Sequence, residues 1–233
     1  IWRAYFFIPL LFCNCKKADP PLFELLPATR TGIDFTNTLS EGDSLNILNY
    51  IYYYNGGGVA VADFNNDGLE DIFFTGNETS CRLYLNKGRL KFEDVTEQAG
   101  LETTRWCTGV AIADVNGDGL RDIYVCVAGY PQPERRGNLL FVNQGPAPGG
   151  GVPAFREMAA EYGIADTGYS TQAAFFDYDN DGDLDLYVMN HANERATLNT
   201  PLPKKTNGEG SSNDHLYRNN GGGTFTDVTR EAG

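Results

Sequence analysis

Short apolar runs flank an acidic stretch at three places in the chain. The runs before and after each acidic stretch are, in order, "GVAVA" (58–62) and "IFF" (72–74), "GVAIA" (109–113) and "IYVCV" (123–127), "QAAFF" (172–176) and "LYVM" (186–189). Two apolar runs of strand length joined by a glycine-containing turn are typical of a β-hairpin. Because the runs are almost continuously hydrophobic, we expect strands that are covered on both faces.

A second repeated element follows each hairpin. Its copies are "RLYLNKGRLKFEDVTEQAGL" (82–101), "HLYRNNGGGTFTDVTREAG" (215–233) and, more loosely, "NLLFVNQ…AFREMAAEYGI" (138–164). Each copy predicts another strand pair around an Asn/Gly turn, with at most one helical turn in "DVTEQAG". Four short antiparallel strands over roughly 45 to 60 residues are what a β-propeller blade requires. The sequence therefore predicts an all-β fold, a β-propeller, with about three blades near 58–101, 107–165 and 172–233.

The N-terminal region 22–57 contains an isolated copy of the end of this repeat. "FELLPATRTGI" (23–33) is similar to "FEDVTEQAGL" (92–101), so we expect a strand there that completes the last blade of a ring. Three blades are too few to close a propeller, and 58–233 is therefore expected to be incomplete at its C-terminal end. The segments 130–153 and 191–214 are rich in Pro, Gly and polar residues and predict long surface loops.

Residues 1–21 predict an export segment and a linker. The chain begins with Ile, and the apolar run 5–12 is too short to span a membrane but fits the later part of a secretory signal. The cysteine after this run resembles a bacterial lipoprotein signal, with Cys15 as the acylation candidate and Cys13 as its alternative. A buried N-terminal strand is the other interpretation. We expect an exported outer-membrane lipoprotein, on the periplasmic side or the cell surface, that contacts the membrane only through a lipid anchor.

The three acidic stretches share the pattern Asp-x-(Asp/Asn)-x-Asp-Gly-x-x-Asp. They are "DFNNDGLED" (63–71), "DVNGDGLRD" (114–122) and "DYDNDGDLD" (177–185). The residues at positions 2, 4 and 8 vary, while positions 1, 3, 5, 6 and 9 do not, which indicates a binding constraint. Asp, Asn and Gly also favour ordinary turns, but three matching copies make that alternative weak. An EF-hand would need a 12-residue loop between two helices.

The donors in these loops favour calcium. Calcium accepts six to eight oxygen ligands in flexible geometry, whereas magnesium demands strict octahedral geometry, and zinc or iron would favour His or Cys. We expect about three Ca²⁺ ions, held by side-chain oxygens at positions 1, 3, 5 and 9 and by the backbone carbonyl at position 7. The predicted ligands are Asp63, Asn65, Asp67, Leu69 and Asp71; Asp114, Asn116, Asp118, Leu120 and Asp122; and Asp177, Asp179, Asp181, Asp183 and Asp185.

Composition narrows the function classes. The net charge is −13, from 31 acidic and 18 basic residues, so nucleic acid is a poor partner. Cys107 and Cys126 could pair, but two buried thiols are the favoured interpretation. The only two histidines, His191 and His215, are expected to be polar loop residues. No catalytic constellation is visible in the sequence, which favours a protein that is not an enzyme.

The loop stretches also resemble a known family. "VADFNNDGLEDIFF", "IADVNGDGLRDIYV" and "FFDYDNDGDLDLYV" resemble FG-GAP/VCBS repeats, whose blades hold calcium in integrin α-subunit propellers. Together with "LYLNKG…FEDVTEQAGL" and "TGIDFTNTL", they are similar to bacterial proteins of the ASPIC/UnbV type, which are related to cartilage acidic protein. The resemblance covers roughly residues 22 to 233, while the ASPIC/UnbV portion itself lies outside this chain.

The resemblance implies a seven-bladed propeller, calcium between the first two strands of a blade, and an exported protein that is often a lipoprotein. We therefore expect a calcium-binding scaffold that binds a protein or a glycan at the cell envelope. The alternatives are the propeller portion of an extracellular carbohydrate-active enzyme and a module of a larger uptake or adhesion complex. The oligomeric state stays open.

Overall fold

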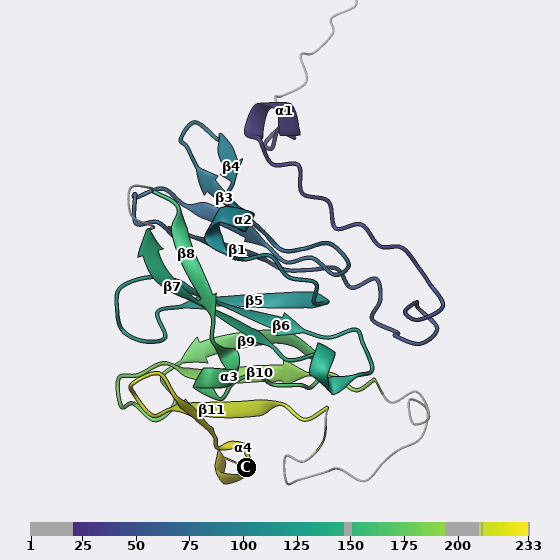
Figure 1. Cartoon of the computed structure of the whole chain (residues 1–233), viewed down its shortest axis with the longest axis vertical. Helices are drawn as coiled ribbons and strands as arrows, with labels where there is room; N and C mark the ends of the chain where they lie inside the picture. The colour runs from purple at the N-terminus through teal and green to yellow at the C-terminus, as the bar shows by residue number, and fades with distance from the viewer. Residues whose placement is uncertain (1–20, 147–150, 194–209, 211, 233) are drawn as a thin grey trace, which may run out of the picture.

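The computed structural model describes residues 21–146, 151–193, 210 and 212–232, which form three four-stranded antiparallel sheets (Figure 1). The first sheet contains β1 (Val59–Ala62), β2 (Asp71–Phe74), β3 (Arg82–Asn86) and β4 (Phe92–Asp94). The second contains β5 (Cys107–Ala113), β6 (Asp122–Val127), β7 (Leu139–Pro146) and β8 (Pro153–Glu157). The third contains β9 (Ser170–Phe176), β10 (Asp185–Asn190), β11 (His215–Asn219) and β12 (Phe225–Asp227).

Strands are neighbours in sequence order within every sheet. The all-β prediction and the four-strand repeat are thus confirmed, and the sheets have the form of propeller blades. Over the described residues no sheet closes on itself. The acylation candidates Cys15 and Cys13 lie outside the described residues, as does most of the predicted loop 191–214. The other predicted loop, 130–153, is wrong in part, because β7 occupies 139–146 and β8 begins at Pro153; the 3-10 turn η1 (Pro133–Arg135) precedes β7.

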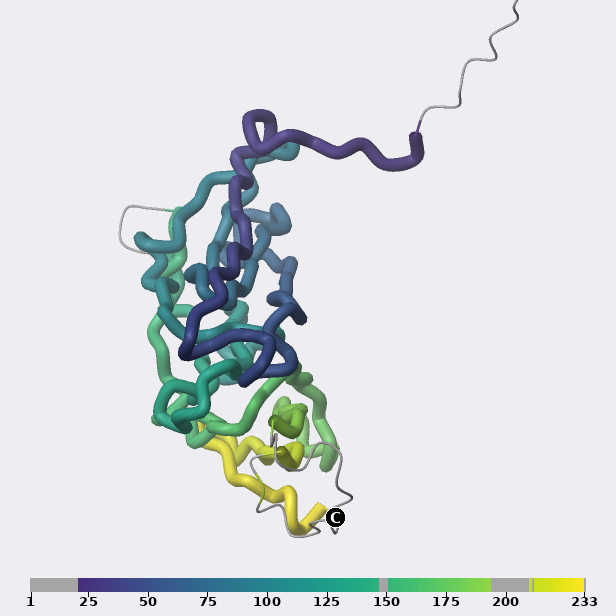
Figure 2. Tube along the Cα trace, turned by 90° about the vertical axis from the view of Figure 1, so that its right-hand side faces the viewer, coloured from purple at the N-terminus to yellow at the C-terminus, as the bar shows by residue number. Residues whose placement is uncertain are grey.

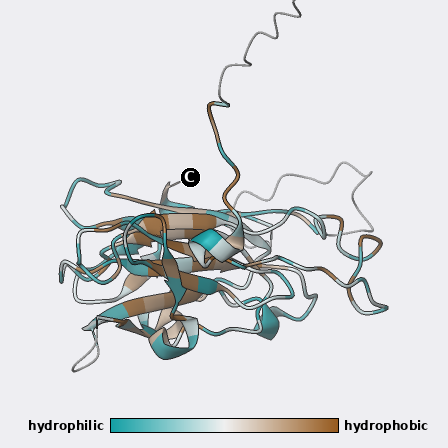
Figure 3. Ribbon diagram, turned by 90° about the horizontal axis from the view of Figure 1, so that it is seen from above, coloured by the Kyte–Doolittle hydropathy of each residue, from teal (hydrophilic) through white to brown (hydrophobic). Residues whose placement is uncertain are grey.

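Two hydrophobic cores hold the three sheets in a stack. The core between the first and second sheets includes Phe73, Leu83 and Val125, and the core between the second and third includes Tyr124 and Leu186. In Figure 3 the strands contain many of the hydrophobic residues, and many loop residues are hydrophilic. All six residues of β6 are buried because this strand lies in the middle sheet.

Side chains at both end faces of the stack are exposed, although Asp34 and Phe35 cover Tyr84 and Phe74 on the first of them. On β1, the side chains of Val59 and Val61 are 59% and 58% exposed, so the expectation of strands covered on both faces is wrong there. At the other end of the stack, Tyr187 and Met189 of β10 are also exposed. The cause is positional: no other sheet of the described residues packs on these two faces.

A four-residue helical turn follows each outer strand: α2 (Thr96–Ala99), α3 (Ala159–Tyr162) and α4 (Thr229–Ala232). Gly100 and Gly163 end the first two turns with left-handed backbones, and a Cβ on either would lie 3.2 Å from the carbonyl oxygen of Phe155 or Phe225 in the next sheet. Only glycine avoids both the strain and the crowding. α2 and α3 therefore pack the first and second sheets against the outer strand of the following sheet.

The described N-terminal residues form no strand, so the ring-closing strand stays a prediction. Instead of a strand, the described part of 22–57 contains α1 (Ala28–Thr31), which Gly32 ends against the carbonyl of Phe92, as α2 ends against the second sheet. The segment "FELLPATRTGI" thus resembles the repeat end in forming a short helical turn. The preceding residues, such as Phe23, are exposed, and Pro27 has no N–H for a strand ladder.

The segment that follows α1 runs along the edge of the stack opposite the acidic loops (Figures 1 and 2). Asn37 exchanges hydrogen bonds with Asn77, and the Tyr53 hydroxyl donates to Glu78 at 2.9 Å. Tyr50 is buried in an aromatic core with Trp106. This segment therefore connects the sheets at one edge and leaves the acidic loops free at the other. Over the described residues, no helix has the length and hydrophobicity needed to cross a bilayer.

Candidate functional site

The three acidic stretches form matching loops between the first two strands of each sheet. In the first loop, the Asp63 carboxylate accepts hydrogen bonds from the N–H groups of Asp67 at 3.1 Å and Gly68 at 2.8 Å. Asp114 and Asp177 do the same in their own loops, through equivalent residues. The glycine at position 6 has a left-handed backbone in all three loops, which a side chain would disfavour. Each loop is therefore folded around its first aspartate.

The aspartate at position 9 of each loop, Asp71, Asp122 or Asp185, is buried at the start of the second strand. In the second loop, Asp122 Oδ2 accepts from Val115 N–H at 2.9 Å and Oδ1 from Asn143 N–H at 2.8 Å. The other two loops contain the same pair of hydrogen bonds, within 0.1 Å in length. The closing aspartate therefore joins the loop to the third strand as well as facing the other acidic groups.

The electrostatics of the second loop favour a cation. Burial raises the pKa of Asp122 to about 6, the Val115 and Asn143 N–H groups act to lower it, and the carboxylates of Asp118 and Asp114 raise it further. Burial likewise raises the pKa of Asp71 in the first loop. Carboxylates held close together in this way repel one another, and a bound divalent cation would neutralise that repulsion.

The third loop has the most concentrated donor set. Carboxylate oxygens of Asp177, Asp179 and Asp185 lie within 4.8 Å of one another. Asparagine replaces the second of these carboxylates in the first two loops, as Asn65 and Asn116, and still offers an oxygen. An all-oxygen set of this kind fits calcium. All the predicted ligands, including the carbonyl groups of Leu69, Leu120 and Asp183, stay predictions.

Two features of the loops are not evident from the motif. Position 2 varies in sequence, but Phe64 and Val115 at this position are 1% and 4% exposed, because they pack into the cores between the sheets. The second feature is an asparagine in the third strand, Asn86, Asn143 or Asn219, whose backbone N–H donates to the closing aspartate. The sequence signal for this asparagine is the Asn-x-Gly pattern that it begins in each repeat.

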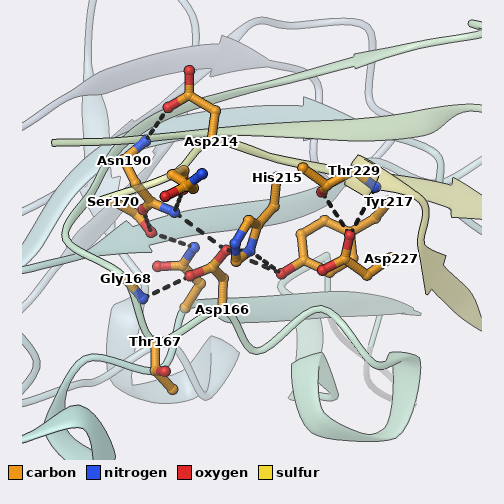
Figure 4. Close-up of polar contacts among 12 residues, drawn as sticks. Asp166, Thr167, Gly168, Ser170, Asn190, Asp214, His215, Tyr217, Asp227 and Thr229 are labelled. Carbon is orange, nitrogen blue, oxygen red and sulfur yellow. Dashed lines mark hydrogen bonds and ion pairs between the residues drawn. The ribbon is translucent and has the colours of Figure 1, made fainter. Parts of the chain in front are cut away.

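A separate polar cluster lies between the second and third sheets (Figure 4). Asp166, 5% exposed, accepts hydrogen bonds from Gly168 N–H at 2.6 Å and Tyr217 hydroxyl at 3.0 Å, and its Oδ2 lies 2.6 Å from His215 Nδ1. Burial acts to raise the pKa of Asp166, but the hydrogen bond and charge of His215, helped by Gly168 and Tyr217, outweigh it and lower the pKa. A cavity of about 630 Å³ adjoins the cluster. His215 lies in β11, so its assignment to a loop was wrong.

The other histidine belongs to the aromatic core at the edge opposite the acidic loops. The His191 ring centroid lies 4.0 Å from that of Tyr52 and 5.6 Å from that of Tyr169. Neither ring nitrogen has a hydrogen-bond partner among the described residues. Cys81, Cys107 and Cys126 are buried free thiols, as the sequence favoured for the last two.

We expect His191 to make the protein sensitive to acid. Burial lowers the pKa of His191 from 6.5 to about 4. The unfolded chain therefore binds more protons than the folded chain between these values, and stability is lost as pH falls from 6.5 to about 4. We expect melting curves at pH 7, 6, 5 and 4 to show a smaller decline in a His191→Phe variant than in the wild-type protein. Parallel declines would contradict this assignment.

The fold and the loops are similar to those of a known class of repeat protein. Residues 63–125, which include the first two loops, match the family described as an FG-GAP-like repeat. Together with the three four-stranded sheets, this match supports a repeat protein of the FG-GAP, integrin-α-like type.

Individual relatives agree with this class. The chain is 27% identical to cartilage acidic protein 1 of Mus musculus over 167 residues, which cover 70% of this chain and 24% of that protein. It is 30% identical to cartilage acidic protein 1 of Xenopus tropicalis over 148 residues, covering 63% and 21%. It is 29% identical to integrin alpha-8 of Mus musculus over 140 residues, covering 52% and 13%. The chain thus spans about a quarter or less of the length of these relatives.

Proposed function

We propose that this chain is a calcium-binding β-propeller scaffold that presents a binding surface for a protein or a glycan. The observation that carries the proposal is the threefold repetition of an oxygen-lined loop with a buried closing aspartate, at the same place in each sheet. In this proposal, Asp, Asn and carbonyl oxygens of each loop hold one Ca²⁺ ion. The ion supplies positive charge that neutralises the carboxylates, while the loop residues keep the hairpin in shape.

The complete protein, in this proposal, contains further blades, up to the seven that the sequence resemblance implies. The two exposed end faces support this part. Tyr187 of β10 and Tyr124 of β6 each lie two residues after the closing aspartate of their loop. Tyr124 is fully buried, whereas 37% of the surface of Tyr187 is exposed. Val59 and Val61 lie on the face at the other end. A further sheet on each end would cover these residues as the middle sheet is covered.

Location and partner are inferred from the sequence resemblance. We propose export and a lipid anchor on Cys15, with the propeller in the periplasm or on the cell surface. Protein or glycan binding without turnover is the proposed activity. Release of a product from a bound glycan would instead support the alternative, the propeller portion of a carbohydrate-active enzyme.

Calcium content tests the proposal directly. Equilibrium dialysis of the purified chain against buffered Ca²⁺, with metal analysis of the dialysed protein, is expected to give about three bound ions per chain. An Asp67→Ala variant should lose one ion, whereas Glu70→Gln, which removes a charge at the variable position 8 of the same loop, should keep all three. No bound calcium at millimolar Ca²⁺ would overturn the proposal.

A further inference from the structure

Two buried asparagines form hydrogen bonds between adjacent loops. Asn143 in β7 donates from Nδ2 to the carbonyl oxygen of Phe64 at 2.9 Å, across 79 positions of the chain. Asn219 in β11 repeats this contact one sheet further on, with Nδ2 lying 3.4 Å from the carbonyl oxygen of Val115. Phe64 and Val115 occupy position 2 of the first and second acidic loops. Each asparagine therefore bonds to the loop of the preceding sheet.

The same asparagines also bond to the loop of their own sheet. Asn143 donates its backbone N–H to Asp122 Oδ1 at 2.8 Å, and its side chain lies 3.3 Å from the carbonyl of Arg121. Asn219 makes the equivalent contacts with Asp185 and Leu184, at 2.8 and 3.2 Å. One residue thus touches two neighbouring loops.

These contacts join all three loops in one series. Phe64 N–H donates to the closing Asp71, and the Phe64 carbonyl accepts from Asn143, which in turn donates to Asp122. Val115 then continues the series in the same way through Asn219 to Asp185. Every side chain in the series is at most 4% exposed, so water competes little for these hydrogen bonds.

The bond to position 2 acts on the ligands of the preceding loop. The carbonyl of Phe64 belongs to the peptide group that joins Phe64 to Asn65, and Asn65 is a predicted ligand. Fixing this peptide group restricts the backbone between Asp63 and Asn65, whose side chains must both face the ion. Losing the bond would leave a buried carbonyl without its partner and the ligands less constrained.

We propose that Asn143 and Asn219 are positioning residues that couple neighbouring calcium sites, so that the affinities of the first and second loops depend on the asparagine of the next sheet. The inference rests on the proposed calcium function. Because coupling between binding sites is reciprocal, filling one loop also favours filling its neighbour. Asn86 offers a contrast within the chain: among the described residues its side chain contacts its own loop, through the Glu70 carbonyl at 2.9 Å.

The test isolates the first loop. In the full chain, Asp118→Ala and Asp181→Ala disable the second and third loops, and calcium binding to the first is measured by isothermal titration calorimetry. Adding Asn143→Ala is expected to weaken this binding by about three- to tenfold, the effect of one hydrogen bond. The control is Gln144→Ala, which removes the exposed amide of the next residue and should leave the affinity unchanged.

A second pair of variants repeats the test on the second loop. With Asp67→Ala and Asp181→Ala in place, Asn219→Ala should weaken calcium binding by the same factor, and its exposed neighbour Asn220→Ala should not. Circular dichroism confirms that each variant is folded. Unchanged affinity in both asparagine variants, or equal losses in the controls, overturns the coupling alone. No calcium binding by the parent chains overturns the proposed function, and the coupling with it.

Discussion

EDTA is expected to lower the melting temperature of the protein by more than about 10 °C. A site held at a hundred times its dissociation constant stabilises the folded state by about 2.7 kcal/mol. Three such loops would contribute about 8 kcal/mol, and in a chain of this size each kcal/mol shifts the melting temperature by roughly 2 to 4 °C. The physical reason is that each ion neutralises clustered carboxylates and holds a hairpin whose strands are short. Differential scanning calorimetry with and without excess Ca²⁺ measures the shift.

The control for the EDTA experiment is a variant that lacks one predicted calcium ligand in each loop. A variant with Asp67→Ala, Asp118→Ala and Asp181→Ala should melt at a temperature that EDTA does not change. Glu70→Gln should retain the full response, because the residue lies in a loop but is not a predicted ligand. Magnesium added at the same concentration is expected to restore less of the lost stability than calcium, since its octahedral preference suits the loops less well. An identical wild-type melting curve in EDTA would contradict calcium stabilisation.

The local parts of this structure follow from the sequence. Apolar runs on both sides of Asp/Asn/Gly loops specify hairpins, because the turn chemistry and the strand pattern act within about twenty residues. The predicted ligand positions accordingly lie in the loops between the first two strands, except the closing aspartates, which begin the second strand. The helical turn at "DVTEQAG" was equally local, since Gly100 ends it with a left-handed backbone.

The remaining features depend on how the sheets pack. The sequence around Asn143 is typical of a turn. Its hydrogen bond to Phe64 forms only because the second sheet stacks on the first. His215 reads as a polar loop residue, and its pairing with Asp166 requires the third sheet to lie against the end of the second. The burial of Phe64 at a variable motif position has the same origin. The repeat pattern predicts the strands of each sheet. The contacts between neighbouring sheets depend on how the side chains pack and on which buried polar groups need hydrogen-bond partners.

Replacing the closing aspartate is expected to be more damaging than replacing a loop ligand, even without calcium. Asp122→Ala would remove a buried carboxylate and leave the N–H groups of Val115 and Asn143 without acceptors. Each unsatisfied buried group costs about 1 to 3 kcal/mol, so we expect a loss of about 4 kcal/mol in the free energy of unfolding. Urea denaturation in EDTA measures this loss directly.

Asp118→Ala is the matched comparison within the same loop. Asp118 is exposed, and its Oδ1 accepts from Leu120 N–H at 2.8 Å. Its replacement should therefore cost less than about 1 kcal/mol in EDTA and show its main effect only when calcium is present. The two variants thus separate a residue that holds the sheet together from one that binds the ion. Equal losses for both in EDTA would show that the closing aspartate has no structural role beyond that of the other acidic residues.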